Sequence, residues 1–316
     1  MPDWKLVVGG GLLFVTGAAW LGRFGAIFEL LPNGRSQILV VAAVAFLVLA
    51  LKKAKLPATF ALLALAINGF YLLPYATASA STQTASGPEV SVMQFNIFYN
   101  NDDTDSIAAH ILEADADIAV LHELLPEQWE QMEPALSLRY PHILAEPFRA
   151  ETGQLSGGMA ILASAPLDRQ PVPREASPAD RVLLVAETEL HGTPLTVIGL
   201  HPHASRFESR KIELREAQIN ATIDIANQAE GAVIVATDLN ITPTSPTYGH
   251  FLDQTGWADP HRTVGWHSTW PTWGSAFGVP IDHVFTSEHL TPTAYETGDG
   301  AGSDHRSLVA TFTLSQ

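Results

Sequence analysis

The hydrophobic pattern of the chain changes near residue 76. Before that point, three apolar runs contain no charged residue: Leu6–Gly22, Ser36–Leu51 and Leu56–Ala76. Beyond residue 88, apolar positions come in short β-rich runs that alternate with helical stretches and with breaks at Pro and Gly. Residues 77–88 are small, polar and uncharged, which predicts a flexible linker. The pattern therefore predicts an apolar region at 1–76, a linker at 77–88 and a second domain at 89–316.

The apolar region predicts three transmembrane helices. A hydrocarbon core about 30 Å thick is usually crossed by about 20 residues, and the first two runs are slightly shorter. Lys5, Arg23, Arg35 and Lys52 flank these runs and can extend to the membrane surface, so the mismatch costs little. The alternative is a set of buried helices in a soluble domain, but the sequence offers no polar segment to cover them. We therefore expect residues 6–76 to lie in a lipid bilayer.

The distribution of lysines predicts how the chain is oriented in the membrane. Lys52, Lys53 and Lys55 lie between the second and third runs. Short cytoplasmic loops are enriched in Lys and Arg, so this loop is predicted to be cytoplasmic. Three spans then place everything after Ala76 outside the cytoplasm. The absence of cysteine is compatible with that compartment and does not require it.

Residues 89–316 predict an α/β domain. The expected strands are Val90–Phe98, Ile118–Leu121, Gly158–Ala163, Val182–Leu190, Leu195–Leu200, Val233–Ala236, His283–Thr286 and Leu308–Leu314. The expected helices are Asp105–Ala114, Pro126–Leu138, Phe207–Gln228 and Ser245–Gln254. So many strands with helices between them predict two sheets packed face to face with helices outside. A purely parallel sheet is disfavoured because some neighbouring strands lack a crossover helix.

Two of the expected strands end in oxygen donors. Asn96 ends the run that begins at Val90, and Glu123 ends the run that begins at Ile118. Mg²⁺ binds oxygen ligands and keeps several waters, so one carboxylate and one amide carbonyl are enough to hold it. Taken singly, Asn96 is also typical of a turn and Glu123 of a solvated surface. Their common position at the carboxyl ends of apolar strands favours a metal site.

The run Val233–Thr237 leads to Asp238 and Asn240 in the same way. Residues i and i+2 share a face in an extended chain, so both side chains are expected to face one ligand. The Asp-x-Asn pattern alone is more typical of a turn.

Histidines and further acids follow in two short segments, Ile281–His283 and Ser303–His305. A catalytic histidine needs a carboxylate that fixes its tautomer and stabilises its charged form, and Asp282 can serve His305 in this role. Asp304 is then free to face the metal. His201, at the end of the strand Leu195–Leu200, offers a second imidazole for a phosphate oxygen or a leaving group.

Seven stretches together resemble the endonuclease/exonuclease/phosphatase superfamily, which includes deoxyribonuclease I, abasic-site endonucleases, neutral sphingomyelinases and inositol polyphosphate 5-phosphatases. They are QFNI (94–97), LHE (121–123), GGMAIL (157–162), GLHPH (199–203), ATDLN (236–240), PIDHVF (280–285) and GSDHRSL (302–308). The arrangement is most similar to bacterial members with several membrane helices before the catalytic domain. This resemblance implies a bacterial inner membrane, with the catalytic domain expected on the periplasmic side. Two positions depart from the family pattern: Thr237 replaces a glycine and His122 replaces a glutamine.

The resemblance implies a four-layered α/β/β/α sandwich and a role for each site residue. It implies that Asn96, Glu123 and Asp304 surround Mg²⁺, with Mn²⁺ as the other candidate. It also implies that Asp238 and Asn240 position or activate water, and that His305 and Asp282 form an acid/base dyad. His201 matches the second histidine of the deoxyribonuclease and sphingomyelinase branches.

The net charge of the second domain helps to choose between classes of phosphodiester substrate. Residues 1–88 hold six of the 17 Lys and Arg residues and two of the 33 Asp and Glu residues, so residues 89–316 carry a net charge of −20. This charge weakens a non-specific grip on DNA, which depends on contacts between cations and phosphates. Candidate phosphate contacts are Arg149, Arg206, Arg210, Arg215 and Arg306. The aromatic cluster Trp266, Trp270, Trp273 and Phe277 is typical of core packing or of a platform for a base or a lipid tail.

The sequence therefore predicts a membrane-anchored, Mg²⁺-dependent phosphodiester hydrolase. Nucleic acid is the first candidate substrate, and a phospholipid head group or another phosphoester is the second. An inactive binding module is disfavoured because Glu123, Asp238 and His305 are all present. A transporter is disfavoured because the three apolar runs contain no ionisable residue of the kind that lines an ion path.

Overall fold

Two mixed β-sheets form the second part of the chain in the computed structural model, which describes residues 3–24, 26–78, 87–149, 158–169, 181, 183–204 and 208–314. The first sheet has the order β10 (Leu290–Thr297), β11 (Leu308–Leu314), β1 (Glu89–Asn96), β2 (Ile118–Leu124), β4 (Gly158–Ala163), β3 (His142–Glu146). The second has the order β5 (Leu167–Arg169), β6 (Leu183–Leu190), β7 (Thr193–Leu200), β8 (Ala232–Asp238), β9 (Asp282–Thr286). The pairs β1–β2 and β7–β8 are parallel, and the other pairs are antiparallel.

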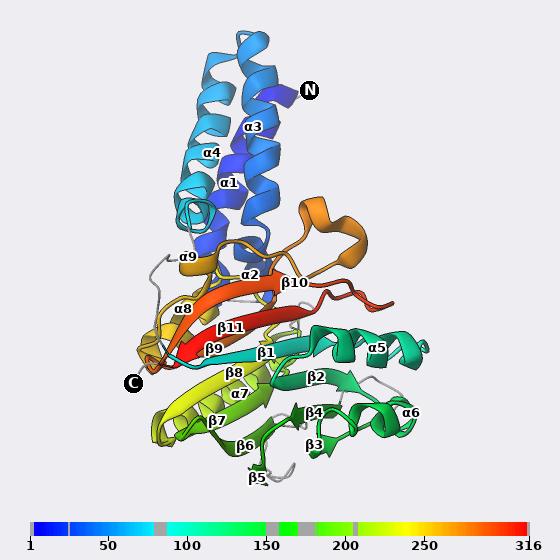
Figure 1. The fold of residues 1–316 in the computed structure, drawn as a ribbon. Helices are drawn as coiled ribbons and strands as arrows, with labels where there is room; N and C mark the ends of the chain where they lie inside the picture. The colour runs from blue at the N-terminus through cyan, green and yellow to red at the C-terminus, as the bar shows by residue number, and fades with distance from the viewer. Residues whose placement is uncertain are drawn as a thin grey trace.

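The sheets pack face to face, and two helices cover the outer face of each (Figure 1). Helices α5 (Thr104–Ala114) and α6 (Pro126–Leu136) cover the first sheet, and α7 (Ser209–Gln228) and α8 (Pro246–Thr255) cover the second. Alternation along each strand explains the layers: Val90 and Val92 of β1 face the second sheet, whereas Met93 and Phe95 pack with α5 and α6. The predicted α/β/β/α sandwich is confirmed.

The eight predicted strands and four predicted helices are present, with bounds shifted by at most three residues in the described part. Strands β3, β5 and β10 were not predicted. In β10, Pro292 lies beside a register shift on the edge of the first sheet. An edge strand tolerates a proline, and this is why the sequence pattern did not indicate a strand there.

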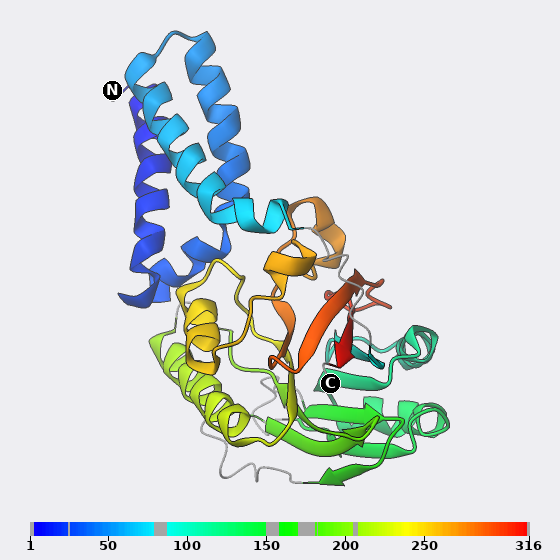
Figure 2. The same ribbon diagram turned by 60° about the vertical axis from the view of Figure 1, so that its left-hand side comes forward.

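Helices α1 (Trp4–Ala18), α3 (Arg35–Leu51) and α4 (Lys55–Ala76) form a bundle that stands on the sandwich (Figure 2). Two segments, Trp4–Gly22 and Lys55–Ala76, are long and apolar enough to cross a membrane. Only 22% and 28% of their most apolar windows are buried, so neither resembles the core helix of a soluble domain. Arg35–Leu51 is apolar but shorter, at 17 residues. The prediction of three membrane helices is therefore supported for two.

The segment between the first two apolar runs is not a free loop. It forms a 3₁₀ helix, η1 (Ala19–Phe24), followed by α2 (Ala26–Asn33). Asn33 Oδ1 accepts hydrogen bonds from the backbone N and from Oγ1 of Thr242, at 3.0 and 3.1 Å. The buried carboxylate of Glu29 contacts the buried guanidinium of Arg215 on α7. The bundle therefore docks on the sandwich through α2.

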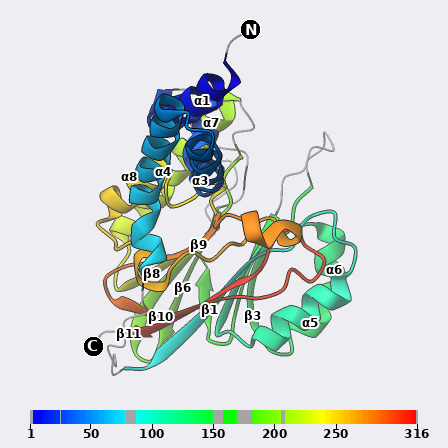
Figure 3. The same cartoon turned by 90° about the horizontal axis from the view of Figure 1, so that it is seen from above.

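The bundle lies over the side of the sandwich that carries α7 and α8 (Figure 3). Tyr75, near the end of α4, donates a hydrogen bond of 3.1 Å to the carbonyl of Pro243. Most of the predicted linker, 79–86, lies outside the described residues. The contacts of α2 and α4 join the two parts of the chain directly, without that linker.

Candidate active site

Polar side chains replace apolar ones where β1, β8 and β9 meet between the sheets. Along β8, Ile234 and Ala236 face the first sheet, and the same alternation brings Asp238 to that face at the strand end. Asp282 is its register partner at the start of β9. On β1, Gln94 and Asn96 follow Val92 on the inner face. All four polar residues are buried, and hydrogen bonds join them across the two sheets.

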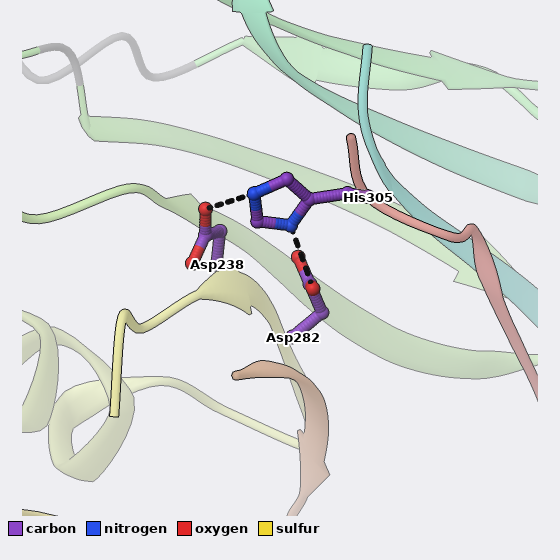
Figure 4. A group of neighbouring side chains, drawn as sticks. All are labelled: Asp238, Asp282 and His305. Atoms are coloured by element: carbon purple, nitrogen blue, oxygen red, sulfur yellow. Dashed lines mark hydrogen bonds and ion pairs between the residues drawn. The ribbon is translucent and has the colours of Figure 1, made fainter. Parts of the chain in front are cut away.

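His305 lies between the two aspartates (Figure 4). Its Nδ1 is 2.9 Å from Asp282 Oδ2, and its Nε2 is 3.7 Å from Asp238 Oδ2. Gln94 Nε2 donates a hydrogen bond of 2.8 Å to the other oxygen of Asp282. The carboxylate of Asp282 is thus fixed from both sides, which holds the His305 ring with Nε2 towards Asp238.

Burial and charge push the pKa values of this group in definite directions. Burial alone would lower the pKa of His305, but the carboxylates of Asp282 and Asp238 raise it to about 10. Burial, and then the charge of Asp282, raises the pKa of Asp238. Burial opposes the ionisation of Asp282, but the His305 imidazolium and the Gln94 hydrogen bond lower its pKa. The site therefore favours an Asp282 carboxylate beside a His305 imidazolium.

Glu123 and His201 form the next part of the site. Glu123 has a left-handed backbone (φ 61°) at a register shift between β2 and β4. This bulge turns its side chain towards His201, whose Nε2 is 3.4 Å from Glu123 Oε1. His201 Nδ1 lies 3.5 Å from Asp238 Oδ2. The hydrogen bond and charge of His201, acting against burial, bring the pKa of Glu123 to about 2.

Asn96 joins Asp238, but Asn240 does not share its face. Asn96 Nδ2 donates a hydrogen bond of 2.9 Å to Asp238 Oδ2. The backbone of Asn240 is left-handed (φ 58°), so the expectation of an extended chain from Asp238 to Asn240 is wrong. The Asn240 N–H instead donates to Asp238 Oδ1 at 3.0 Å, and its side chain donates to the carbonyl of Pro202 at 3.2 Å. Asn240 therefore fixes the Asp238 carboxylate through its backbone, while its side chain ties this turn to the residue that follows His201.

Asp304 has a carboxylate oxygen without a partner. Trp270 Nε1 donates to Asp304 Oδ2 at 3.1 Å, whereas the buried Oδ1 accepts no hydrogen bond. Ser303 Oγ donates to the carbonyl of Asn96 at 2.7 Å, which ties this loop to the end of β1. A buried carboxylate oxygen without a partner costs free energy unless a cation or water satisfies it.

The oxygen donors at this edge fit a divalent cation. Asp304 Oδ1 accepts no hydrogen bond, and the contacts of the Glu123 oxygens with the Tyr99 N–H and with His201 Nε2 are long, at 3.4 Å. Hard oxygen ligands of this kind suit Mg²⁺ or Mn²⁺. Asp238, Asp282 and His305 also lie close enough to share an ion. In that group, however, His305 Nδ1 is already bonded to Asp282 and its raised pKa opposes a ligand role, so the first set fits better.

Two partners of the site were not predicted from the sequence. Gln94 orients Asp282, and its signal was its position two residues before Asn96 on the same face of β1. Trp270 holds Asp304; the sequence marked it only as one of an aromatic cluster, and its bond to Asp304 was not predicted. His122, which departs from the family pattern, is buried beside His201, and burial lowers its pKa to about 3. It therefore adds no charge to the site.

Several solved structures share this fold at low sequence identity. An endonuclease/exonuclease/phosphatase from Beutenbergia cavernae has a TM-score of 0.58 at 21% identity, over 72% of each chain. A Staphylococcus aureus beta toxin with bound magnesium ions has a TM-score of 0.53 at 16% identity, over 72% of this chain and 100% of the toxin. Sphingomyelinase C from Streptomyces griseocarneus has a TM-score of 0.50 at 19% identity, over 71% of this chain and 99% of the enzyme.

Family membership rests on the sequence. No curated protein matches the chain. Residues 93–305, however, match the model of the Endonuclease/Exonuclease/phosphatase family. The match covers more than half of the chain and includes every residue of the site described above. The chain belongs to the endonuclease/exonuclease/phosphatase family.

Proposed function

We propose that this chain is a membrane-anchored, Mg²⁺-dependent phosphodiester hydrolase. Members of its family are phosphoester hydrolases that generally depend on a divalent metal. The observation that carries the proposal is the position of His305, held by Asp282 at 2.9 Å and facing Asp238 at 3.7 Å. This places a histidine that carries a proton beside a carboxylate with a raised pKa, at an edge that also carries free oxygen donors.

The two groups take different parts in hydrolysis. Asp238, held by Asn96 and by the Asn240 N–H, positions the attacking water and accepts its proton. His305, as an imidazolium stabilised by Asp282, donates a proton to the leaving oxygen. His201 faces the same space and can bind a phosphoryl oxygen. Asn96, Glu123 and Asp304 would hold the cation, which would supply positive charge that offsets the negative charge of the phosphoryl oxygens.

The contacts of the arginines weaken the case for nucleic acid as substrate. Arg149 pairs with Glu127, and Arg210 pairs with Glu213. Arg215 is buried against α2, and Arg206 lies outside the described residues. Only Arg306 of the five candidates is both described and next to the site, so the electrostatic grip on a phosphate backbone is small. The fold shared with a sphingomyelinase C and the proposed anchor together favour a lipid phosphodiester.

A substrate panel tests this proposal. Purified full-length protein in detergent with Mg²⁺ should hydrolyse bis(p-nitrophenyl) phosphate and a lipid phosphodiester in mixed micelles. Under the same conditions it should cleave single-stranded DNA, double-stranded DNA and RNA at least about tenfold more slowly, because the described residues place few unpaired cations near the site. Faster cleavage of a nucleic acid than of every lipid tested would make nucleic acid, and not a lipid phosphodiester, the favoured substrate. Failure to hydrolyse any diester would reject the hydrolase.

We also propose that the catalytic domain lies outside the cytoplasm. The amino-terminal end of α1 and the loop Lys52–Lys55 lie together at the end of the bundle that is remote from the sandwich (Figures 1 and 2). The lysines of that loop favour the cytoplasmic side.

Reporters fused after Gln316 test this orientation. An alkaline phosphatase reporter, active only outside the cytoplasm, should be active in this fusion, and a green fluorescent protein reporter should be dark. The reverse pattern would place the catalytic domain inside the cell.

A further inference from the structure

The loop before β9 exposes aromatic side chains. Within residues 89–316, four large hydrophobic side chains are exposed among the described residues: Leu138, Trp270, Trp273 and Phe277. Three of the four belong to this loop, whose centre is the 3₁₀ segment η3 (Thr272–Phe277). Trp273 is 85% exposed and Phe277 is 66% exposed. Side chains of this size, gathered on one loop, mark a contact surface.

The loop lies beside the base of the bundle (Figures 1 and 2). Gln37, in the first turn of α3, donates a hydrogen bond of 2.6 Å from Nε2 to the carbonyl of Phe277. Val40, Val41 and Val44 are exposed immediately above Gln37 on the same helix. Phe277 therefore lies at the level where the exposed apolar surface of α3 begins.

Aromatic side chains mark the same level on the other two long helices. Trp20 follows α1 and Tyr71 lies near the end of α4, and Trp20 Nε1 donates to the Tyr71 hydroxyl at 2.8 Å. The guanidinium of Arg35 lies over the Tyr71 ring at 3.9 Å. Trp, Tyr and Arg gather where membrane helices leave the hydrocarbon and enter the head-group layer. The base of the bundle thus has the composition of a membrane interface.

The loop also touches the active site. Trp270 donates to Asp304 Oδ2, and the backbone N–H of Thr272 donates to the Asp304 carbonyl at 2.9 Å. Thr272 Oγ1 donates to the carbonyl of Ser303 at 3.1 Å. One short loop therefore connects the base of the bundle to the segment that carries a candidate metal ligand and His305.

This loop is uncharged, whereas the domain around it is strongly acidic. Residues 270–279 contain no charged side chain, whereas residues 89–316 carry a net charge of −20. An acidic surface is repelled by anionic lipids, and burying its charges against a bilayer would cost free energy. A neutral aromatic segment is free of both penalties. Trp and Phe are also typical of interfacial membrane contacts.

We propose that Trp273 and Phe277 enter the interfacial layer of the bilayer that holds the bundle, and that this contact sets the active site against the lipid head groups. The inference rests on the membrane anchor and the hydrolase of the proposed function. It assigns the site a class of substrate, phosphodiesters presented in the adjacent leaflet. It also gives Trp270 a positioning role, because Trp270 links the membrane contact to Asp304.

Fluorescence quenching in lipid nanodiscs tests the contact without any activity assay. The chain has no cysteine, so Trp273→Cys in the full-length protein can be labelled at one position with an environment-sensitive nitrobenzoxadiazole dye. Leu138→Cys is the matched control, because Leu138 is 88% exposed and follows α6, away from the bundle. Lipids that carry a nitroxide near the head group should quench the dye at 273 at least threefold more than the dye at 138.

Two results would contradict the proposed contact between this loop and the membrane. Equal quenching at 273 and 138 would show that the loop stays in water. A dye at 273 that is shielded only at high protein concentration, without quenching by lipid, would show that a second copy of the chain covers the loop.

A double substitution, Trp273→Ser with Phe277→Ser, tests the consequence for substrate. Turnover of water-soluble bis(p-nitrophenyl) phosphate should stay within twofold of wild type, because neither side chain belongs to the site. Turnover of a lipid phosphodiester in vesicles should fall about tenfold or more. Equal losses on both substrates would overturn the substrate assignment. If the wild type hydrolyses neither substrate, the hydrolase is rejected, while the quenching experiment still decides the membrane contact.

Discussion

Removal of divalent metal should abolish hydrolysis, and Mg²⁺ or Mn²⁺ should restore it. The expected loss is at least about 10³-fold, because a metal ion stabilises phosphoryl charge by several kcal/mol and each ~1.4 kcal/mol changes a rate tenfold. The structural basis is the unpartnered Oδ1 of Asp304 together with the loosely held carboxylate of Glu123. The measurement is the rate of bis(p-nitrophenyl) phosphate hydrolysis after treatment with a chelator and after titration with each metal.

Substitution of one proposed metal ligand distinguishes weaker metal binding from misfolding of the protein. Glu123→Gln should raise the Mg²⁺ concentration needed for half-maximal rate by about 10-fold or more, since charged ligands govern the affinity of hard cations. Excess Mg²⁺ should restore part of its activity. Glu127→Gln is the matched control, because Glu127 is an exposed carboxylate that pairs with Arg149 away from the site. Full turnover of the wild type in excess chelator would contradict the metal requirement.

Loss of either member of the His305–Asp282 pair should slow turnover about 10²–10⁴-fold, the usual contribution of a positioned acid or base. His305→Ala removes the proton donor. Asp282→Asn leaves the ring without the carboxylate that raises its pKa and holds its Nδ1 at 2.9 Å. Neither residue belongs to the proposed metal set, so the Mg²⁺ dependence should change little. His289→Ala, at an exposed position after β9, should behave as wild type.

The double variant shows whether the pair acts as one unit. Combining His305→Ala with Asp282→Asn should cost little more than the worse single change, because residues of one catalytic unit are strongly non-additive. Multiplicative losses in folded protein would mean that Asp282 only fixes the strand end and that His305 acts alone. Single-turnover rates, with circular dichroism as the check on folding, distinguish the two outcomes.

The sequence predicted most of the sandwich because its strands are short apolar runs, several of them buried on both faces, between breaks and helical stretches. Asn96 was expected at the site because it ends the run that begins at Val90, and the structure places it beside Asp238. The prediction that Asn240 shares a face with Asp238 failed, because the strand ends at Asp238 and the backbone of Asn240 is left-handed. A turn that starts with an Asp-x-Asn pattern is decided by local hydrogen bonds, which alternation does not encode.

The docking of the bundle could not be predicted from local patterns. Glu29 contacts Arg215 on α7, far away in the sequence, and nothing in the local pattern around either residue indicated this contact. Arg215 in turn looked like a candidate phosphate contact and is buried instead. Contacts of this kind depend on how two folded parts meet, and neither helical period nor charge pattern carries that information.

The most direct test of the central claim is one comparison of rates with purified full-length protein and bis(p-nitrophenyl) phosphate. Wild type is measured in Mg²⁺ and in chelator, and His305→Ala is measured in Mg²⁺ after the same purification. The account predicts turnover by wild type in Mg²⁺ only, and a rate about 10²–10⁴-fold lower for His305→Ala. Equal rates for wild type and His305→Ala, or an equal rate in chelator, would contradict it.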